Sequence, residues 1–418
     1  MLIILLLVSL SFSLDLKDLW HEALKNNFSL KAQKRAVLYS DYELKAFKNL
    51  YLPEISVNYS QNFQNEKQKF EINFPVNIAF SKKKYKILSA SITQLIYDFG
   101  SRERIIEIAE DKKGIEELKY EKEKRTLLLE VGVAYLRLLK AKEIIEVYKK
   151  ELEAVNSHYE LVKALYEKGL VAFADLLEAK VRLSEVKANL SKAKSDYRIA
   201  LFNLSRLTGI PEHRLKKLEK PRINLRLMPL EEYINRALER REEIKIYKKL
   251  IEIAKKERSI SLRKFLPSIF FRVSYDYTDR NPVIEPKGIT TFSFGVFANF
   301  KGIMPYYDMK AKKELVLKLL NELEDLKKLI ELEVKTAYER LKNSRVRLEV
   351  AREALRYAKE HYRLALGQYK NQLISHTDLI TAEARLTAAR KRLVLAKYEI
   401  FESYLRLLSA SGLLGGEL

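Results

Sequence analysis

Two stretches of the chain, HYELVKALYEKGLVAFADLLEAKVR (158–182) and HYRLALGQYKNQLISHTDLITAEAR (361–385), align without a gap at an offset of 361 − 158 = 203 residues. Nine of the 25 aligned positions are identical, where chance would give about one or two. The identical pairs are His158/His361, Tyr159/Tyr362, Leu161/Leu364, Tyr166/Tyr369, Leu170/Leu373, Asp175/Asp378, Leu176/Leu379, Ala179/Ala382 and Arg182/Arg385. The sequence therefore predicts a structural duplication.

The positions of the prolines predict where the long helices lie. Residues 76–210 and 306–418 contain no proline, and both intervals are rich in helix formers with apolar residues three and four apart. We expect one long helix over 101–167 and another over 306–370, each about 100 Å in length. A short turn leads from each to a return helix, over 171–208 in the first half and 374–408 in the second.

Each half is predicted to begin with an amphipathic helix, over about 15–49 and about 230–264, which a Leu-Pro dipeptide ends. Two strands follow in each half, within about 52–98 and about 266–300, because apolar and polar residues alternate there. The apolar members of this alternation include Ile55, Val57 and Tyr59 in the first half and Phe292 and Phe294 in the second.

The N-terminal run MLIILLLVSLSFS is short and apolar and ends in small residues, which is typical of a secretory signal peptide, although no Lys or Arg precedes it. A buried N-terminal helix is the alternative. The predicted organisation is a signal peptide (1–13), a first repeat (14–209), a linker (210–229), a second repeat (230–412) and a C-terminal tail (413–418). The interval 64–86, which contains Pro75, is an outer loop or part of a longer strand.

Composition excludes several classes of protein. The chain has no cysteine among its 418 residues, which excludes a disulfide scaffold, a thiolate metal site and a lipid-modified N-terminal cysteine. Its net charge is 78 − 56 = +22. After the predicted signal peptide its longest uncharged run, 288–300, is shorter than the roughly 20 residues of a membrane-spanning helix. Any contact with a membrane must therefore be made by strands or by a surface.

Four strands cannot close a barrel, and lipid does not tolerate open sheet edges. Three chains would supply twelve strands, which is within the range of outer-membrane barrels. Aromatic residues gather where strands meet helices, as a membrane-interface girdle requires. The predicted interface residues are Tyr51, Tyr97, Phe99, Phe265, Tyr306 and Tyr307. A soluble sheet packed on helices is the alternative, but it gives no reason for such long helices.

The order of elements and four motifs resemble the TolC outer-membrane factor family. The motifs are LPEIS (52–56), LPSIF (266–270), QLIYDFGSRERI (94–105) and GLVAFADLLEA (169–179). The resemblance implies a homotrimer that closes a twelve-stranded barrel in the outer membrane and continues as a helical tunnel across the periplasm. It also implies a passive exit duct for an efflux pump or a type I secretion system, with a periplasmic adaptor and an inner-membrane pump as partners.

The resemblance further implies a gate at the periplasmic helix turns, where acidic residues narrow the tunnel and attract cations. The resemblance assigns five residues of this chain to the gate, which are Asp175, Asp378, Glu178, Tyr166 and Tyr369. The second half departs from the family pattern, since Thr381 replaces a second acid and Ile374 stands where an arginine is expected. A simpler alternative is that Asp175 and Asp378 stabilise the starts of the return helices through the helix dipole.

The sequence gives little support for metal binding or for catalysis. The five histidines are scattered without an HExxH motif, and the pair His158/His361 is better explained by duplication than by a metal site. No phosphate-binding GxxxxGK[ST] loop or GxSxG nucleophile motif is present, so we expect neither an enzyme nor a cofactor. A periplasmic adaptor or a structural coiled-coil protein is the alternative function. A basic nucleic-acid-binding protein is a weaker one, because lysine and glutamate are interspersed on the helix faces.

Overall fold

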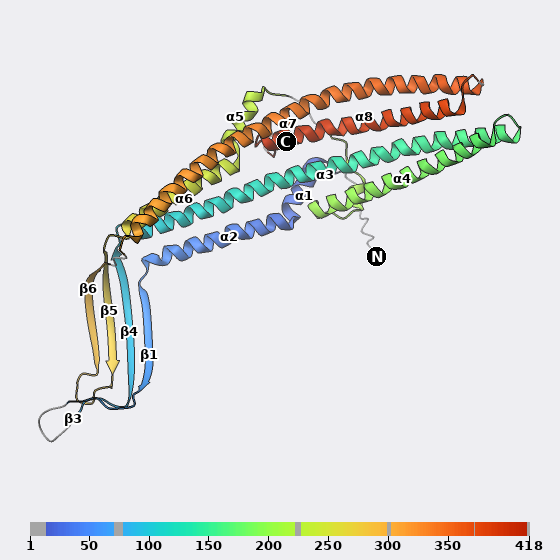
Figure 1. Ribbon diagram of the computed structural model, residues 1–418. Coiled ribbons are helices and arrows are strands. Elements are labelled where there is room, and N and C mark those ends of the chain that lie inside the picture. Colours follow the sequence, from blue (N-terminus) through green and yellow to red (C-terminus); the bar gives the residue numbers. More distant parts are fainter. Residues whose placement is uncertain (1–13, 71–77, 222–226, 299–301, 372, 416–418) are drawn as a thin grey trace, which may run out of the picture. The chain divides into compact units, whose positions relative to one another are not determined.

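A computed structural model describes residues 14–70, 78–221, 227–298, 302–371 and 373–415 (Figure 1). The predicted signal peptide and Pro75 lie outside the described residues. The chain forms two compact units. The hairpin unit comprises Met1–Lys34, Lys119–Ile244 and Asp325–Leu418, and the sheet unit comprises Arg35–Leu118 and Lys245–Glu324.

The predicted fold class, mainly helical with four long strands, is confirmed. The helices are α1 (Leu16–Asn26), α2 (Phe28–Lys48), α3 (Ser101–Glu167), α4 (Phe173–Thr208), α5 (Leu230–Arg240), α6 (Glu242–Arg263), α7 (Met304–Lys370) and α8 (His376–Ala410). The strands are β1 (Glu54–Phe63), β2 (Lys69–Phe70), β3 (Ile78–Ala79), β4 (Lys84–Tyr97), β5 (Ser268–Thr278) and β6 (Gly288–Phe297). The short paired strands β2 and β3 lie in the interval 64–86.

The four long strands form one antiparallel sheet in the order β1-β4-β5-β6, so that β1 and β6 are its edges (Figure 1). Successive side chains of a strand point to opposite faces, and the pairing register therefore sorts residues into rows. An apolar row consists of Ile55, Ile92, Val273 and Phe292. The next row is polar and consists of Ser56, Ser91, Ser274 and Thr291. One face of the sheet is thus apolar here and the other is polar.

The predicted single helices over 15–49 and 230–264 are wrong, because each is interrupted by one buried residue in an extended conformation. Asn27 has φ −63° and ψ 129°, and its side-chain Oδ1 accepts hydrogen bonds from the backbone N–H groups of Ser29 at 2.9 Å and Leu30 at 3.2 Å. It thereby caps the start of α2. Arg241 has φ −57° and ψ 126° between α5 and α6. The two breaks are 241 − 27 = 214 residues apart, the same offset that separates the Leu-Pro dipeptides.

Arg241 is held in place by a buried ion cluster of the hairpin unit. It forms ion pairs with Glu243 at 3.1 Å and Glu333 at 2.8 Å, and it donates a hydrogen bond to the carbonyl of Ala410 at 3.1 Å. Arg125 approaches Glu243 at 3.2 Å from α3. Burial opposes ionisation of the Glu243 carboxyl, but the hydrogen bonds and charge of Arg241, helped by Arg125, outweigh it and lower its pKa to about 2.

Within the hairpin unit, α3 packs on α4 and α7 packs on α8 through residues three and four apart, as in a coiled coil (Figure 1). One contact consists of Leu152, Val155, Tyr159, Leu183 and Val186, and its counterpart consists of Leu355, Ala358, Tyr362, Leu386 and Ala389. The single tryptophan, Trp20 of α1, is buried and donates a hydrogen bond from Nε1 to the carbonyl of Leu128 at 2.7 Å. None of the described helices contains an apolar stretch long enough to span a membrane.

Candidate functional site

The turn between α3 and α4 is closed by a glycine in the left-handed conformation. Gly169 has φ 71°, and its N–H binds the carbonyl of Tyr166 at 2.8 Å, while the N–H of Leu170 binds that of Leu165 at 2.9 Å. This pair of bonds is a Schellman motif, which satisfies the last carbonyls of α3. In the turn between α7 and α8 the N–H of Leu373 likewise binds the carbonyl of Gln368 at 2.9 Å.

Asp175 and Asp378 occupy the same position of their helices, the third residue of α4 and of α8. The carboxylate of Asp378 accepts hydrogen bonds from the N–H of Ser375 at 3.2 Å and from its hydroxyl at 2.6 Å, and the Ser375 hydroxyl accepts one from the N–H of Asp378. These bonds lower the pKa of Asp378. Asp175 makes only half of this capping box, by accepting from the N–H of Ala172 at 3.2 Å, because alanine has no hydroxyl. Both acids therefore have capping geometry.

The two tyrosines predicted for the gate have different surroundings. Tyr166 is 38% exposed and its ring centroid lies 5.7 Å from that of Phe173. Tyr369 is buried, and its ring lies against the rings of His158 and His376, with centroids 5.5 and 6.1 Å away. The exposed Glu178 lies one helical turn beyond Asp175. The two aligned tyrosines thus differ in their contacts.

Sequence reasoning missed the closest neighbour of His158. The ring centroid of His158 lies 4.9 Å from that of His376, whereas its aligned counterpart His361 stacks on Tyr357 at 5.8 Å. The described residues contain no group of three or more His, Asp or Glu side chains arranged to hold a metal ion. The sequence carried no signal for this contact, because His158 and His376 lie on α3 and α8, which are far apart in the chain.

In the sheet unit, the predicted interface aromatics lie where strands end and helices begin. Tyr97 ends β4 and its ring lies 4.8 Å from that of Phe99, while Tyr306 and Tyr307, in the first turn of α7, have ring centroids 5.5 Å apart. The guanidinium group of Arg102 lies 4.9 Å from the ring centroid of Tyr51. Phe265, which follows α6, is 38% exposed.

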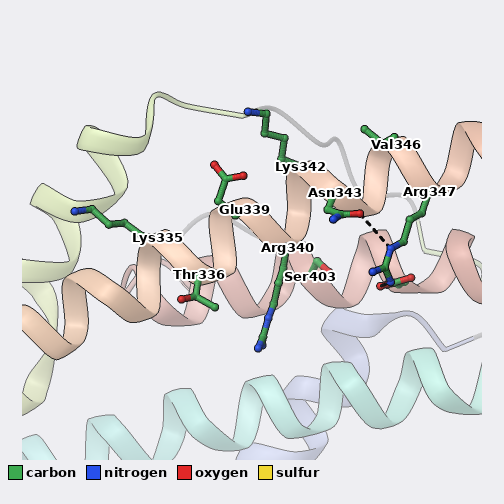
Figure 2. A pocket seen from close by; sticks show the side chains of 10 residues that line it. Lys335, Thr336, Glu339, Arg340, Lys342, Asn343, Val346, Arg347 and Ser403 are labelled. Atoms are coloured by element: carbon green, nitrogen blue, oxygen red, sulfur yellow. Dashed lines mark hydrogen bonds and ion pairs between the residues drawn. The ribbon is translucent and has the colours of Figure 1, made fainter.

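A cavity of about 850 Å³ lies between α7 and α8 (Figure 2). Figure 2 shows the side chains of Lys342 and Arg340 pointing in opposite directions from α7. Arg347 lies at one end, where it donates hydrogen bonds to Asn343 at 3.1 Å and to Glu399 at 3.0 Å. Such charged and ion-paired side chains are typical of a wall that faces water.

The sequence and the fold were compared with known proteins. The family model described as outer membrane efflux protein matches residues 19–210 and 233–413. No curated protein matches the chain. Among solved structures, the outer membrane protein VceC from Vibrio cholerae is similar at a TM-score of 0.80 and 17% identity, covering 95% of this chain and 96% of that one.

Two further solved structures have the same fold. The CmeC outer membrane channel of Campylobacter jejuni matches at a TM-score of 0.80 and 17% identity, covering 95% of this chain and 85% of that one. The MtrE outer membrane channel of Neisseria gonorrhoeae, in its open state, matches at a TM-score of 0.75 and 17% identity, covering 95% of this chain and 89% of that one. The two stretches matched by the family model take in most of the residues of both units. The chain therefore belongs to the outer membrane efflux protein family.

Proposed function

We propose that three copies of the chain form one duct, with their twelve long strands closed into a single barrel. As a member of this family, the protein is the outer-membrane exit duct of a tripartite efflux pump, with part of its chain in the periplasm. It is a passive channel and not an enzyme.

The observation that carries the trimer is the sheet of the single chain. Strands β1 and β6 are open edges, and the apolar row is exposed, with Ile55 69% and Phe292 71% accessible. Pairing β6 of one copy with β1 of the next would satisfy both edges, and lipid would cover the apolar row. The polar row would then line the lumen. The aromatic residues at the sheet's helix end would lie in the lipid headgroup region, where such rings are favoured.

The trimer is tested by the mass of the detergent-purified protein and by its conductance in planar bilayers. We expect a trimer that forms a narrow, cation-selective pore. A monomer that conducts at no voltage would overturn the proposal.

We further propose that the turns of the hairpin unit form the periplasmic gate, with Asp175, Asp378 and Glu178 as its acidic ring. The capping role of Asp175 and Asp378 is compatible with a role in the gate. Hydrogen bonds at a helix start hold a carboxylate in one position, as a fixed acidic ring requires. Replacing both Asp175 and Asp378 by alanine should weaken cation selectivity or widen the resting pore. Glu353→Ala, which removes an exposed acid from α7, is the matched control. If conductance and ion preference of the double variant equal those of the control, the gate assignment is wrong.

A periplasmic adaptor and an inner-membrane pump are the partners that we propose for this gate. The chain lacks a nucleotide-binding loop, so the energy for transport would come from the pump. Pull-down of a membrane-fusion protein by the wild-type duct would test the proposed adaptor.

We also propose that residues 14–209 and 230–412 are repeats of one ancestral unit. The equal offsets of the helix breaks and of the Leu-Pro dipeptides support this proposal.

A further inference from the structure

Behind the turns, the hairpin unit contains two layers of buried titratable side chains where hydrocarbon would be expected. The histidine layer consists of His158 of α3, Tyr369 of α7 and His376 of α8. The glutamate layer consists of Glu151 of α3, Arg182 of α4 and Glu383 of α8. The layers are 158 − 151 = 7 residues apart on α3 and 383 − 376 = 7 residues apart on α8, which is two helical turns.

The histidine layer has few hydrogen-bond partners. His158 is 9% exposed and His376 is 6% exposed. Nε2 of His158, both ring nitrogens of His376 and the hydroxyl of Tyr369 are buried without a partner among the described residues. The charged groups that face His376 are Asp175 and Glu178 of α4. Burial lowers the pKa of His376 against the effect of these acids, and burial together with the charge of His376 lowers the pKa of His158 to about 4.

The glutamate layer contains two carboxyl groups and one tightly bound arginine. Glu151 and Glu383 are each 2% exposed. Arg182 donates to Oε1 of Glu151 at 2.6 Å, while Oε2 of Glu151 and Oε1 of Glu383 have no partner in the described chain. Burial raises the pKa of Glu383 to about 7. The charge of Arg182 lowers this pKa, and the negative charge of Glu151 raises it and so partly cancels the effect of Arg182.

Water can reach the neighbourhood of this layer. A cavity of about 440 Å³ is lined by Glu151 and Glu383 together with Tyr362 of α7 and Arg390 of α8. Arg390 favours ionisation of both carboxyl groups, and Glu185 of α4 binds the far side of Arg182 at 3.2 Å. Protons therefore have a short path between solvent and the carboxyl pair.

We propose that the two layers are opposed proton switches that together hold the ends of the hairpins: acid charges the histidine layer and neutralises the glutamate layer, and base does the reverse. A buried ionised group without partners costs free energy, whereas the neutral form of the same group packs at little cost. Each layer alone would loosen the packing at one end of the pH range. The proposal rests on the proposed gate only for its effect on conduction.

The signs follow from the direction of each shift. The pKa of Glu383 is raised, so its stabilisation of the closed packing is complete below about 4.5 and is lost as the pH rises through about 7. The pKa of His158 is lowered, so its stabilisation is complete above about 6.5 and is lost as the pH falls through about 4. Between these limits each group changes the opening equilibrium by up to about tenfold per pH unit, in opposite directions. The wild-type packing should therefore respond to pH less than a chain with one layer removed.

Hydrogen exchange of the assembled full-length protein tests the proposal without requiring conduction. Protection of peptides that cover the turns, 160–180 and 365–385, is measured at pH 5 and pH 8 and corrected for the intrinsic exchange rate. Glu383→Gln removes one of the two titrating carboxyl groups of the glutamate layer, and His158→Gln removes one of the two titrating imidazoles of the histidine layer, so each variant weakens the response of one layer relative to the wild type. The matched controls are Asp196→Asn, which neutralises an exposed acid of α4 away from both layers, and His361→Gln, which replaces the aligned histidine outside the layers.

We expect Glu383→Gln to lose protection at pH 5 relative to pH 8, and His158→Gln to lose it at pH 8 relative to pH 5. Each change should be tenfold or more, because the interval covers about two pH units of the Glu383 titration and about 1.5 of the His158 titration. The controls should follow the wild type. Variants that shift in the same direction, or that keep the wild-type ratio, would overturn the proposal. If Glu383→Gln does not assemble, the sign of the change in His158→Gln still decides. A protein that conducts no ions but shows the opposed shifts would contradict the gate and not the switches.

Discussion

Replacing Arg241 by methionine should destabilise the hairpin unit by about 2–3 kcal/mol at pH 7. The side chain of Arg241 is 9% exposed and that of Glu243 13%, so water screens their ion pair little. The pKa of Glu243 is lowered from 4.5 to about 2, and a difference of 4.5 − 2 = 2.5 units corresponds to about 3.4 kcal/mol. That value is an upper limit for the part lost through Glu243, because Arg125 still lies 3.2 Å from Glu243. Methionine fills most of the space of the arginine stem.

The effect should depend on pH with a defined sign. A lowered carboxyl pKa contributes stability that is present above about 4.5 and is lost as the pH falls through about 2, so the difference between variant and wild type should shrink by about half at pH 3. Denaturant unfolding, followed by the fluorescence of Trp20 in the same unit, measures it. Arg240→Met, at the exposed neighbouring position, is the control. A variant within about 0.5 kcal/mol of this control at pH 7 would refute the reasoning.

Three further outcomes are expected. Phe292→Lys places a charge in the apolar row and should reduce outer-membrane assembly, because the charge costs about 2–4 kcal/mol in lipid. Thr291→Lys, in the polar row, should assemble like the wild type. Equal yields of the two variants in membrane fractions would contradict the assignment of faces. Trp20→Phe removes the hydrogen bond that the indole donates to the carbonyl of Leu128, which keeps its helical bond within α3, and should lower the unfolding free energy by about 0.5–1.5 kcal/mol, measured by circular dichroism. Ser375→Ala removes the hydroxyl that caps α8 and should speed hydrogen exchange in the first turn of that helix, and unchanged exchange would count against the capping geometry.

The long elements could be predicted from the sequence because their signals are repeated many times. Intervals without proline and with three-and-four apolar spacing gave helices within two residues of α3, α7 and their return partners, and period-two alternation gave the four strands. The breaks at Asn27 and Arg241 were missed, because a single residue between two amphipathic helices does not disturb the period. Asn27 did carry a local signal, because asparagine is favoured at the N-cap, the residue just before the first helical residue.

The candidate site was predictable only in part. Asp175 and Asp378 stand out in the aligned stretches because they match, and the structure places both at helix starts. Glu383 and His376 have no counterpart in the first half and resemble ordinary solvated helix residues. Only packing reveals that they are buried, because a charged residue on the inner side of a helix has the same sequence neighbours as one on the outer side.

The rows of the sheet also have a consequence for the biogenesis of the protein. A newly exported chain has to cross an aqueous compartment while Ile55, Ile92 and Phe292 are bare and both edge strands can pair with any extended segment they meet. During that interval we expect the chain to be prone to aggregation and to proteolysis until it reaches the membrane. Yield in the cell is therefore set by the rate of delivery and insertion, and overproduction beyond that rate should give aggregates even of a sequence whose helices are correctly folded.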